Sequence, residues 1–250
     1  MKRKNLVLIL LCVVMAVPVM AQENEKTSPV DFSLQLKNNH LWRGYEISTE
    51  AAFATNIFVA TKDKSFMLGV WGGAGLSGNY KELDYYTSYS TSGFTVALWD
   101  IYNFSPGAAY NNTNVFEYRA KETGRFIDLS VGYQFQGNFP LSASWATIVY
   151  GRDRDTANEN NRFSTFVTLG YPIIKNRLVN LDLSCSGAFA LNPEENTDAH
   201  FYANDAGIVM VALTASKNIK LGSYNLPVSV MGMWNPVNKN TNIQLAIDIF

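Results

Sequence analysis

Apolar and polar residues alternate along most of the chain from residue 30 to residue 250. The alternation is clearest in residues 125–136, where every second position is apolar: Ile127, Leu129, Val131, Tyr133 and Phe135. Because successive side chains of a β-strand point to opposite faces, this spacing predicts strands with one apolar and one polar face. No ten-residue stretch of this region has a convincing helical period, so the sequence predicts an all-β chain.

Twelve such segments follow one another, separated by short clusters of Gly, Asn, Asp, Ser and Pro. The predicted strands are 30–43, 49–61, 65–77, 81–90, 93–103, 125–136, 140–151, 162–172, 178–190, 206–217, 224–235 and 241–250. Residues 115–121 are assigned to a loop, because an odd number of strands would be unusual for a bacterial barrel. The first predicted strand extends as far as Arg43.

Strand length and loop length favour a single antiparallel transmembrane β-barrel. Strands of about ten to fourteen residues exceed those of most soluble sheets and match the roughly 9 to 11 residues that cross a bilayer. Short connections alternate with long polar ones, as in outer-membrane barrels. A soluble secreted β-protein is the alternative, but its outward face would be polar.

Aromatic residues near the predicted strand ends suit the interfacial girdles of such a barrel, with cross-strand packing as the alternative. They are Trp42, Tyr45, Tyr80, Tyr85, Tyr102, Phe104, Tyr150, Tyr171, Tyr202 and Trp234. The final residue, Phe250, is typical of barrels inserted by the outer-membrane assembly machinery. It falls on the opposite parity from the apolar residues of the last strand, and a β-bulge near the end would restore the phase.

The N-terminus has the pattern of a cleaved signal peptide. Three basic residues precede an apolar run from Leu6 to Met20, and small residues end at Ala21. A membrane anchor is the alternative, but fifteen apolar residues fall short of the roughly 20 that a spanning helix needs. We therefore predict a signal peptide in residues 1–21, a polar periplasmic lead-in in 22–29 and an outer-membrane barrel in 30–250.

Composition adds two constraints. Removal of residues 1–21 leaves 17 basic residues against 21 acidic ones, a formal charge of about −4, so a nucleic-acid partner is not expected. Cys185 is the one cysteine in the mature chain, and an intramolecular disulfide cannot form.

Three motifs occur in order within residues 30–90: an aromatic-Arg-Gly at Trp42 to Gly44, Gly-x-Trp-Gly at Gly69 to Gly72, and Glu-x-Asp-x-Tyr at Glu82 to Tyr86. In these motifs the chain resembles the TorF-like porin family. The resemblance implies an outer-membrane barrel with a channel role and says little about the substrate.

Strand parity assigns nine charged residues to the barrel interior. They are Asp31, Lys37, Arg43, Glu82, Asp84, Asp128, Arg162, Asp182 and Asp248. Because acids outnumber bases, an open lumen would weakly prefer cations; alternatively, the charges pair across the lumen and plug it. The candidate lumen and selectivity residues are Arg43, Glu82, Asp84, Asp128 and Asp182.

Arg43 is placed at the extracellular end of the first strand, near Glu82 and Asp84. An ion pair with one of these acids would fix the register between strands, or the guanidinium would narrow the mouth or contact anionic solutes.

The sequence favours a porin for ions or small hydrophilic solutes over an enzyme. Its two histidines, His40 and His200, lack a nucleophile motif, and no metal or cofactor motif occurs, so no catalytic residue and no cofactor are expected. Outer-membrane lipids, the assembly machinery and small solutes are the expected partners, with the oligomeric state left open. The alternative is a closed barrel with a structural, partner-binding or lipid-modifying role.

Overall fold

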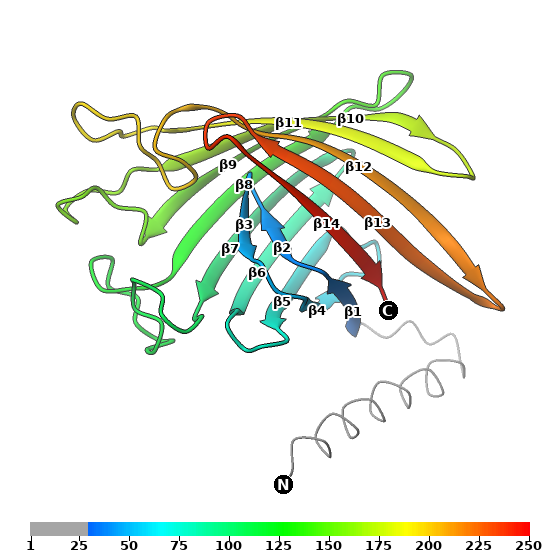
Figure 1. The fold of residues 1–250 in the computed structure, drawn as a ribbon, viewed down its shortest axis with the longest axis horizontal. Helices are drawn as coiled ribbons and strands as arrows, with labels where there is room; N and C mark the ends of the chain where they lie inside the picture. Colours follow the sequence, from blue (N-terminus) through cyan, green and yellow to red (C-terminus); the bar gives the residue numbers. More distant parts are fainter. Residues whose placement is uncertain (1–29) are drawn as a thin grey trace, which may run out of the picture.

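The computed structural model describes residues 30–250, which form a closed barrel of twelve antiparallel strands (Figure 1). Around the barrel the strands follow the order β1-β14-β13-β12-β11-β10-β9-β8-β7-β6-β5-β4, and β4 pairs with β1. The predicted signal peptide and lead-in lie outside the described residues. Among residues 30–250, no helix is long and apolar enough to span a membrane.

The barrel strands are 8 to 15 residues long, compared with the roughly ten to fourteen that the alternation predicts. They are β1 (Val30–Lys37), β4 (Ala52–Ala60), β5 (Phe66–Gly75), β6 (Lys81–Thr91), β7 (Phe94–Asn103), β8 (Phe126–Gln134), β9 (Ser142–Gly151), β10 (Ser164–Lys175), β11 (Asn180–Ala190), β12 (Gly207–Leu221), β13 (Tyr224–Asn235) and β14 (Asn240–Asp248). The predicted count of twelve barrel strands is confirmed, and the predicted bounds of β13 match. Residues 115–121 contain no strand, as expected.

The first predicted strand is wrong beyond residue 37. The chain leaves the wall there and forms a two-stranded hairpin of its own, β2 (His40–Trp42) and β3 (Tyr45–Ser48), which is separate from the barrel sheet. Asn38 anchors the chain to β14 where it departs: its backbone N donates to Leu245 O at 3.1 Å, its Oδ1 accepts from Leu245 N at 2.6 Å, and its Nδ2 donates to Ile243 O at 3.3 Å. We call residues 39–48 the internal hairpin.

The two ends of the barrel differ in their connections. Residues 104–125, 152–163 and 191–206 form long connections at one end, which we call the loop end. The opposite end, the turn end, carries the short connections 61–65, 92–93, 176–179 and 222–223. Figure 1 shows both ends, with the turn between β12 and β13 beside the C-terminus. The predicted alternation of short and long connections therefore holds for these segments.

The outer wall exposes apolar side chains on successive strands. Ile57 is 53 % exposed, Leu68 54 % and Ile243 60 %, and comparable residues occur on β8, β11, β12 and β13. Tyr85 and Tyr150 are also exposed, as expected for girdle residues. The predicted apolar outer face is thus present, but the predicted polar inner face is not polar throughout, because Ile101, Ile148 and Val209 are buried in the interior.

The last strand carries the predicted irregularity. Both Ile249 N and Phe250 N donate to Leu34 O, at 2.7 and 3.4 Å, so two residues of the C-terminal segment face one residue of β1. The Phe250 ring then lies 5.6 Å from the ring of Phe32, which is exposed on the outer wall. This bulge-like pairing returns Phe250 to the apolar face.

Candidate functional site

The internal hairpin turns at Arg43 and Gly44, which both have positive φ, 44° and 92°. This is the backbone requirement of a two-residue hairpin turn, and Gly satisfies it without strain. A Cβ on Gly44 would lie 2.3 Å from Val209 O, and Asn235 Nδ2 donates to Gly44 O at 2.8 Å. The tip of the hairpin is therefore held directly against β12 and β13.

A buried ion pair fixes the hairpin to the opposite wall. Arg43 donates from Nη1 to Asp128 Oδ1 at 2.8 Å and from Nη2 to Oδ2 at 2.5 Å. Nη1 also donates to the hydroxyl of Tyr202 at 2.7 Å. The Asp128 side chain is 1 % exposed, so it depends on Arg43 for compensation of its charge. The geometry is the bidentate fork that guanidinium and carboxylate groups favour.

Aromatic side chains surround this ion pair. The Trp42 ring lies 5.9 Å from that of Phe126 and 5.7 Å from that of Tyr202, and it packs against a buried cluster of inward-facing residues. The cluster comprises Ile101, Phe126, Ile148, Phe166, Ala188, Tyr202 and Val209. The loop-end half of the lumen thus has a hydrophobic core, built between the hairpin and the wall.

Three consecutive cavities follow the hairpin. The outer cavity, about 620 Å³ at the loop end, and the inner cavity, about 420 Å³, are separated by a neck of about 20 Å³. The neck shares Tyr45, Ile47, Asn103 and Arg152 with the outer cavity and Trp42, Glu82 and Ile101 with the inner one. Hairpin residues therefore form one side of this path, and β6, β7, β8 and the start of the β9–β10 loop form the other.

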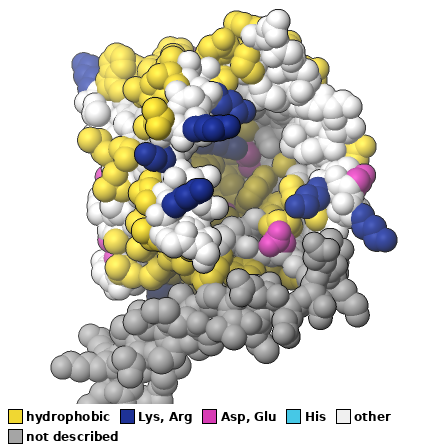
Figure 2. Space-filling model, turned by 90° about the vertical axis from the view of Figure 1, so that its right-hand side faces the viewer, with side chains coloured by type: hydrophobic (Ala, Val, Ile, Leu, Met, Phe, Trp, Pro, Cys, Tyr) yellow, Lys and Arg dark blue, Asp and Glu magenta, His cyan; other side chains and the backbone are white. Residues whose placement is uncertain are grey.

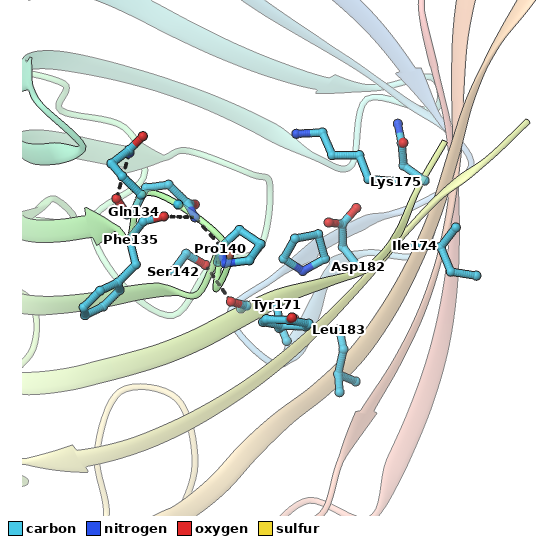
Figure 3. A pocket seen from close by; sticks show the side chains of 15 residues that line it. Gln134, Phe135, Pro140, Ser142, Tyr171, Ile174, Lys175, Asp182 and Leu183 are labelled. Atoms are coloured by element: carbon cyan, nitrogen blue, oxygen red, sulfur yellow. Dashed lines mark hydrogen bonds between the residues drawn. The ribbon is translucent and has the colours of Figure 1, made fainter. Parts of the chain in front are cut away.

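The turn end is hollow. Figure 2 views this end and shows an opening with basic side chains around it. A cavity of about 620 Å³ lies at the ends of β8 to β11 and is lined by Asp182 and Lys175 among others. In Figure 3 these two side chains lie on the same side of the wall, whereas Leu183 points away from them.

The five candidate residues occupy different depths of the lumen. Glu82, Asp84 and Asp128 line the inner cavity together with Arg43, while Asp182 lies apart at the turn end. Arg43 contacts Asp128 rather than Glu82 or Asp84, because the hairpin turn carries it across the lumen. Glu82 Oε2 instead accepts from Asn103 Nδ2 at 2.9 Å, and Asp84 Oδ1 accepts from Tyr102 N at 3.1 Å.

The other charged positions assigned inward by parity are also spread along the barrel. Lys37 lines the inner cavity, and Asp248 accepts a hydrogen bond from Gln35 at 2.6 Å. Arg162 lies in the loop-end connection, 3.3 Å from Glu194. Asp31 is exposed near the turn end, where its Oδ1 accepts from Phe32 N.

Four predicted girdle residues belong instead to the interior. Trp42 and Tyr45 line the neck, Tyr80 is 3 % exposed beside His40, and Tyr202 is 3 % exposed beside Arg43. Arg152, which also lines the neck, is not among the residues predicted from the sequence. One sequence signal could have revealed the internal hairpin, which brings Trp42 and Tyr45 inward. It is the Arg-Gly pair at residues 43–44, which suits a turn between two short alternating segments.

Both histidines take part in local contacts. The His40 ring is stacked 5.6 Å from Trp71 and 5.3 Å from Tyr80. His200 Nε2 lies 3.0 Å from Asp205 O, and burial lowers the pKa of this imidazole. Within residues 30–250, no group of three His, Cys, Asp or Glu side chains is arranged to hold a metal ion.

No protein-family model and no curated protein sequence matches the chain, so the resemblance to the TorF-like porin family is not confirmed. Among solved structures, an outer-membrane channel from Pseudomonas putida F1 is similar, with a TM-score of 0.44 and 12 % sequence identity. The match covers 90 % of this chain and 98 % of that channel. What the protein does must therefore be inferred from its own barrel and cavities.

Proposed function

We propose that the protein is an outer-membrane channel for passive diffusion of ions or small hydrophilic solutes. The observation that carries this proposal is the succession of outer cavity, neck and inner cavity beside the internal hairpin. In an outer-membrane barrel, the long connections face the cell exterior and the short ones the periplasm. The outer cavity then opens outside the cell, and the hollow turn end opens into the periplasm.

The apolar outer wall supports a membrane location. Exposed side chains such as Ile57, Leu68, Leu213 and Ile243 would form an unfavourable contiguous apolar surface in water, whereas lipid covers it without cost. This apolar outer wall also argues against a soluble secreted β-protein. The proposal includes export by the predicted signal peptide and insertion by the outer-membrane assembly machinery. It also includes membership of the TorF-like porin family.

A weak preference for cations follows from the charges along the path. Arg43 neutralises Asp128, so Glu82 and Asp84 are left facing Lys37 in the inner cavity. A net negative charge in a narrow, poorly screened lumen attracts cations. Arg152 at the neck opposes this effect, which is why the preference is weak.

Single-channel conductance of the refolded mature protein, recorded in a planar bilayer under a salt gradient, tests the proposal. We expect small stable current steps and a reversal potential of the sign that favours cations. Replacement of residues 39–48 by a short Gly-Ser linker should raise the conductance several-fold, because it removes one side of the neck. The control replaces residues 155–159, at an exposed loop tip, and should leave the conductance unchanged.

A double variant tests whether Glu82 and Asp84 determine the preference for cations. Replacement of both Glu82 and Asp84 by Asn should move the reversal potential towards anions. An unchanged reversal potential in a folded, conducting variant would remove these two residues from the selectivity argument.

A closed barrel is the second candidate, and the buried Arg43–Asp128 pair favours it because the pair holds the hairpin across the lumen. In that case the wild-type barrel would be silent and the linker variant would conduct. The loop end would then have a structural, partner-binding or lipid-modifying role.

A further inference from the structure

The Arg152 guanidinium lies at the neck, where Glu82 and Asp153 act on it electrostatically but neither forms an ion pair with it. Its Cζ atom lies over the rings of Tyr110, Phe201 and Phe126, at 3.9, 4.7 and 5.1 Å from their centroids. It forms no ion pair with any described residue, and its Nε is buried without a hydrogen-bond partner. Burial lowers the pKa of Arg152, which marks the cost of this environment. Aromatic rings satisfy the faces of a guanidinium but not its N–H donors, which remain available to an anion.

Backbone geometry holds Arg152 in this place. Gly151 precedes it with φ at 105°, and a Cβ there would lie 2.3 Å from Arg125 O. Arg152 N donates to the same Arg125 O at 2.9 Å. The neighbouring Asp153 does not neutralise the guanidinium with an ion pair, because its carboxylate accepts from Ser164 N at 2.7 Å and from Ser164 Oγ at 2.8 Å. The site is therefore built by the fold rather than by a flexible surface arginine.

Glu82 presents the opposite charge to the same neck. Its carboxyl group accepts a hydrogen bond from Asn103, shares another with Asp84, and forms no ion pair with any described residue. Arg152 lines the neck and the outer cavity, whereas Glu82 lines the neck and the inner cavity. A cation and an anion thus stand in sequence along the path, and they do not neutralise each other by direct contact.

We propose that the neck is a binding site for small zwitterions of the amino-acid type, with the carboxylate on Arg152 and the ammonium group on Glu82. This inference rests on the proposed function, since it assigns a solute class to the same path. A guanidinium recognises a carboxylate through two parallel N–H donors, and a carboxylate recognises an ammonium group as a compact charge.

Solutes with a single charge fit this neck less well. An organic anion would leave Glu82 unpaired beside it, and an organic cation would leave Arg152 unpaired. A zwitterion compensates both groups at once. Because a neck of about 20 Å³ has room for little more than one water molecule, the side chains that line it must move apart to admit the solute.

Equilibrium binding to the full mature barrel in detergent micelles tests the inference without requiring conduction. The probes are alanine, propionate and ethylammonium, which have similar size and differ in charge. The readouts are calorimetry and the fluorescence of tryptophan, since Trp42 lines the neck. We expect alanine to bind at least tenfold more tightly than propionate or ethylammonium.

Three variants test which protein side chain binds each charged group of alanine. Arg152→Gln should weaken alanine binding at least tenfold, and Arg152→Lys should restore part of it. Glu82→Gln should bring alanine to the level of propionate. The matched control is Arg177→Gln, since Arg177 is exposed in the turn between β10 and β11, at the opposite end of the barrel. It should leave all three affinities unchanged.

Two results would overturn the inference: alanine binding no tighter than propionate, or undiminished alanine binding by folded Arg152→Gln. Potassium chloride conductance, measured on the same preparation, separates this failure from that of the channel proposal. If the barrel conducts but does not prefer alanine, the channel proposal stands and the zwitterion site is rejected. If alanine binds preferentially to a barrel that does not conduct, the zwitterion site is supported and the channel proposal is rejected.

Discussion

The two halves of the lumen use the same wall in opposite ways. At the loop end, inward-facing side chains such as Ile148 and Val209 are 0 % exposed, because the internal hairpin packs against them. At the turn end, the inward-facing Asp182 and Lys175 are exposed and line an open cavity. One half is packed like the core of a soluble domain, and the other is a solvated mouth.

This contrast indicates where stability arises and, for the proposed channel, where selectivity would arise. Tight packing and buried ion pairs make the loop-end half sensitive to small changes in volume or charge. Wide, solvated surroundings screen charges at the turn end, so single residues there contribute little. The hairpin therefore determines both how firmly the barrel is filled and how narrow its path is.

The largest expected effect comes from the charge pair beneath the hairpin. Asp128→Ala leaves Arg43 partly buried and unpaired, which should lower the free energy of unfolding by about 3–5 kcal/mol. The Arg43 side chain is 17 % exposed and the Asp128 side chain 1 %, so water provides little compensation. Urea unfolding of the refolded barrel, followed by circular dichroism, measures the change.

A double variant separates charge from packing in this prediction. Arg43→Met combined with Asp128→Leu removes both charges and should recover a substantial part of the lost stability. A loss below about 1 kcal/mol in Asp128→Ala would contradict the view that the loop-end half depends on this pair.

The wall could be predicted from sequence because its signal is local. Alternation along each strand shows which residues share the apolar outer face, and the length of each alternating segment indicates the length of the strand. The change of phase at Phe250 is visible for the same reason, and the shared acceptor Leu34 O is consistent with a bulge there. These features need no information about the rest of the chain.

The internal hairpin could not be predicted in this way because its contacts are distant in sequence. Arg43 and Asp128 are separated by 85 positions, and Asn235 and Gly44 by 191. Trp42 and Tyr202 belong to the residue types that form interfacial girdles, so composition alone does not reveal that they face inward. Asp84 and Asp128 both line the inner cavity, but parity does not show which charges meet.

A smaller effect is expected at the tip of the hairpin. Gly44→Ala combines a positive φ with a Cβ that would meet Val209 O, and should cost roughly 2–4 kcal/mol. Gly78→Ala is the matched control, because Gly78 has φ at 85° but nothing within 4 Å of a Cβ. It should cost roughly 1–2 kcal/mol. Urea unfolding measures both, and equal losses would show that the close approach to β12 adds nothing.

The smallest effect is expected at the turn end. Asp182→Ala should change the free energy of unfolding by less than about 0.5 kcal/mol, because Asp182 is exposed and forms no ion pair within the described residues. Its effect on the reversal potential should be smaller than that of Glu82 and Asp84, and should vanish at 1 M salt, where the screening length is about 3 Å. Recordings at about 0.1 M and 1 M salt test both statements. A shift as large as that of the inner-cavity variant, and persistent at 1 M, would place the selective step at the turn end and remove the functional contrast between the two halves.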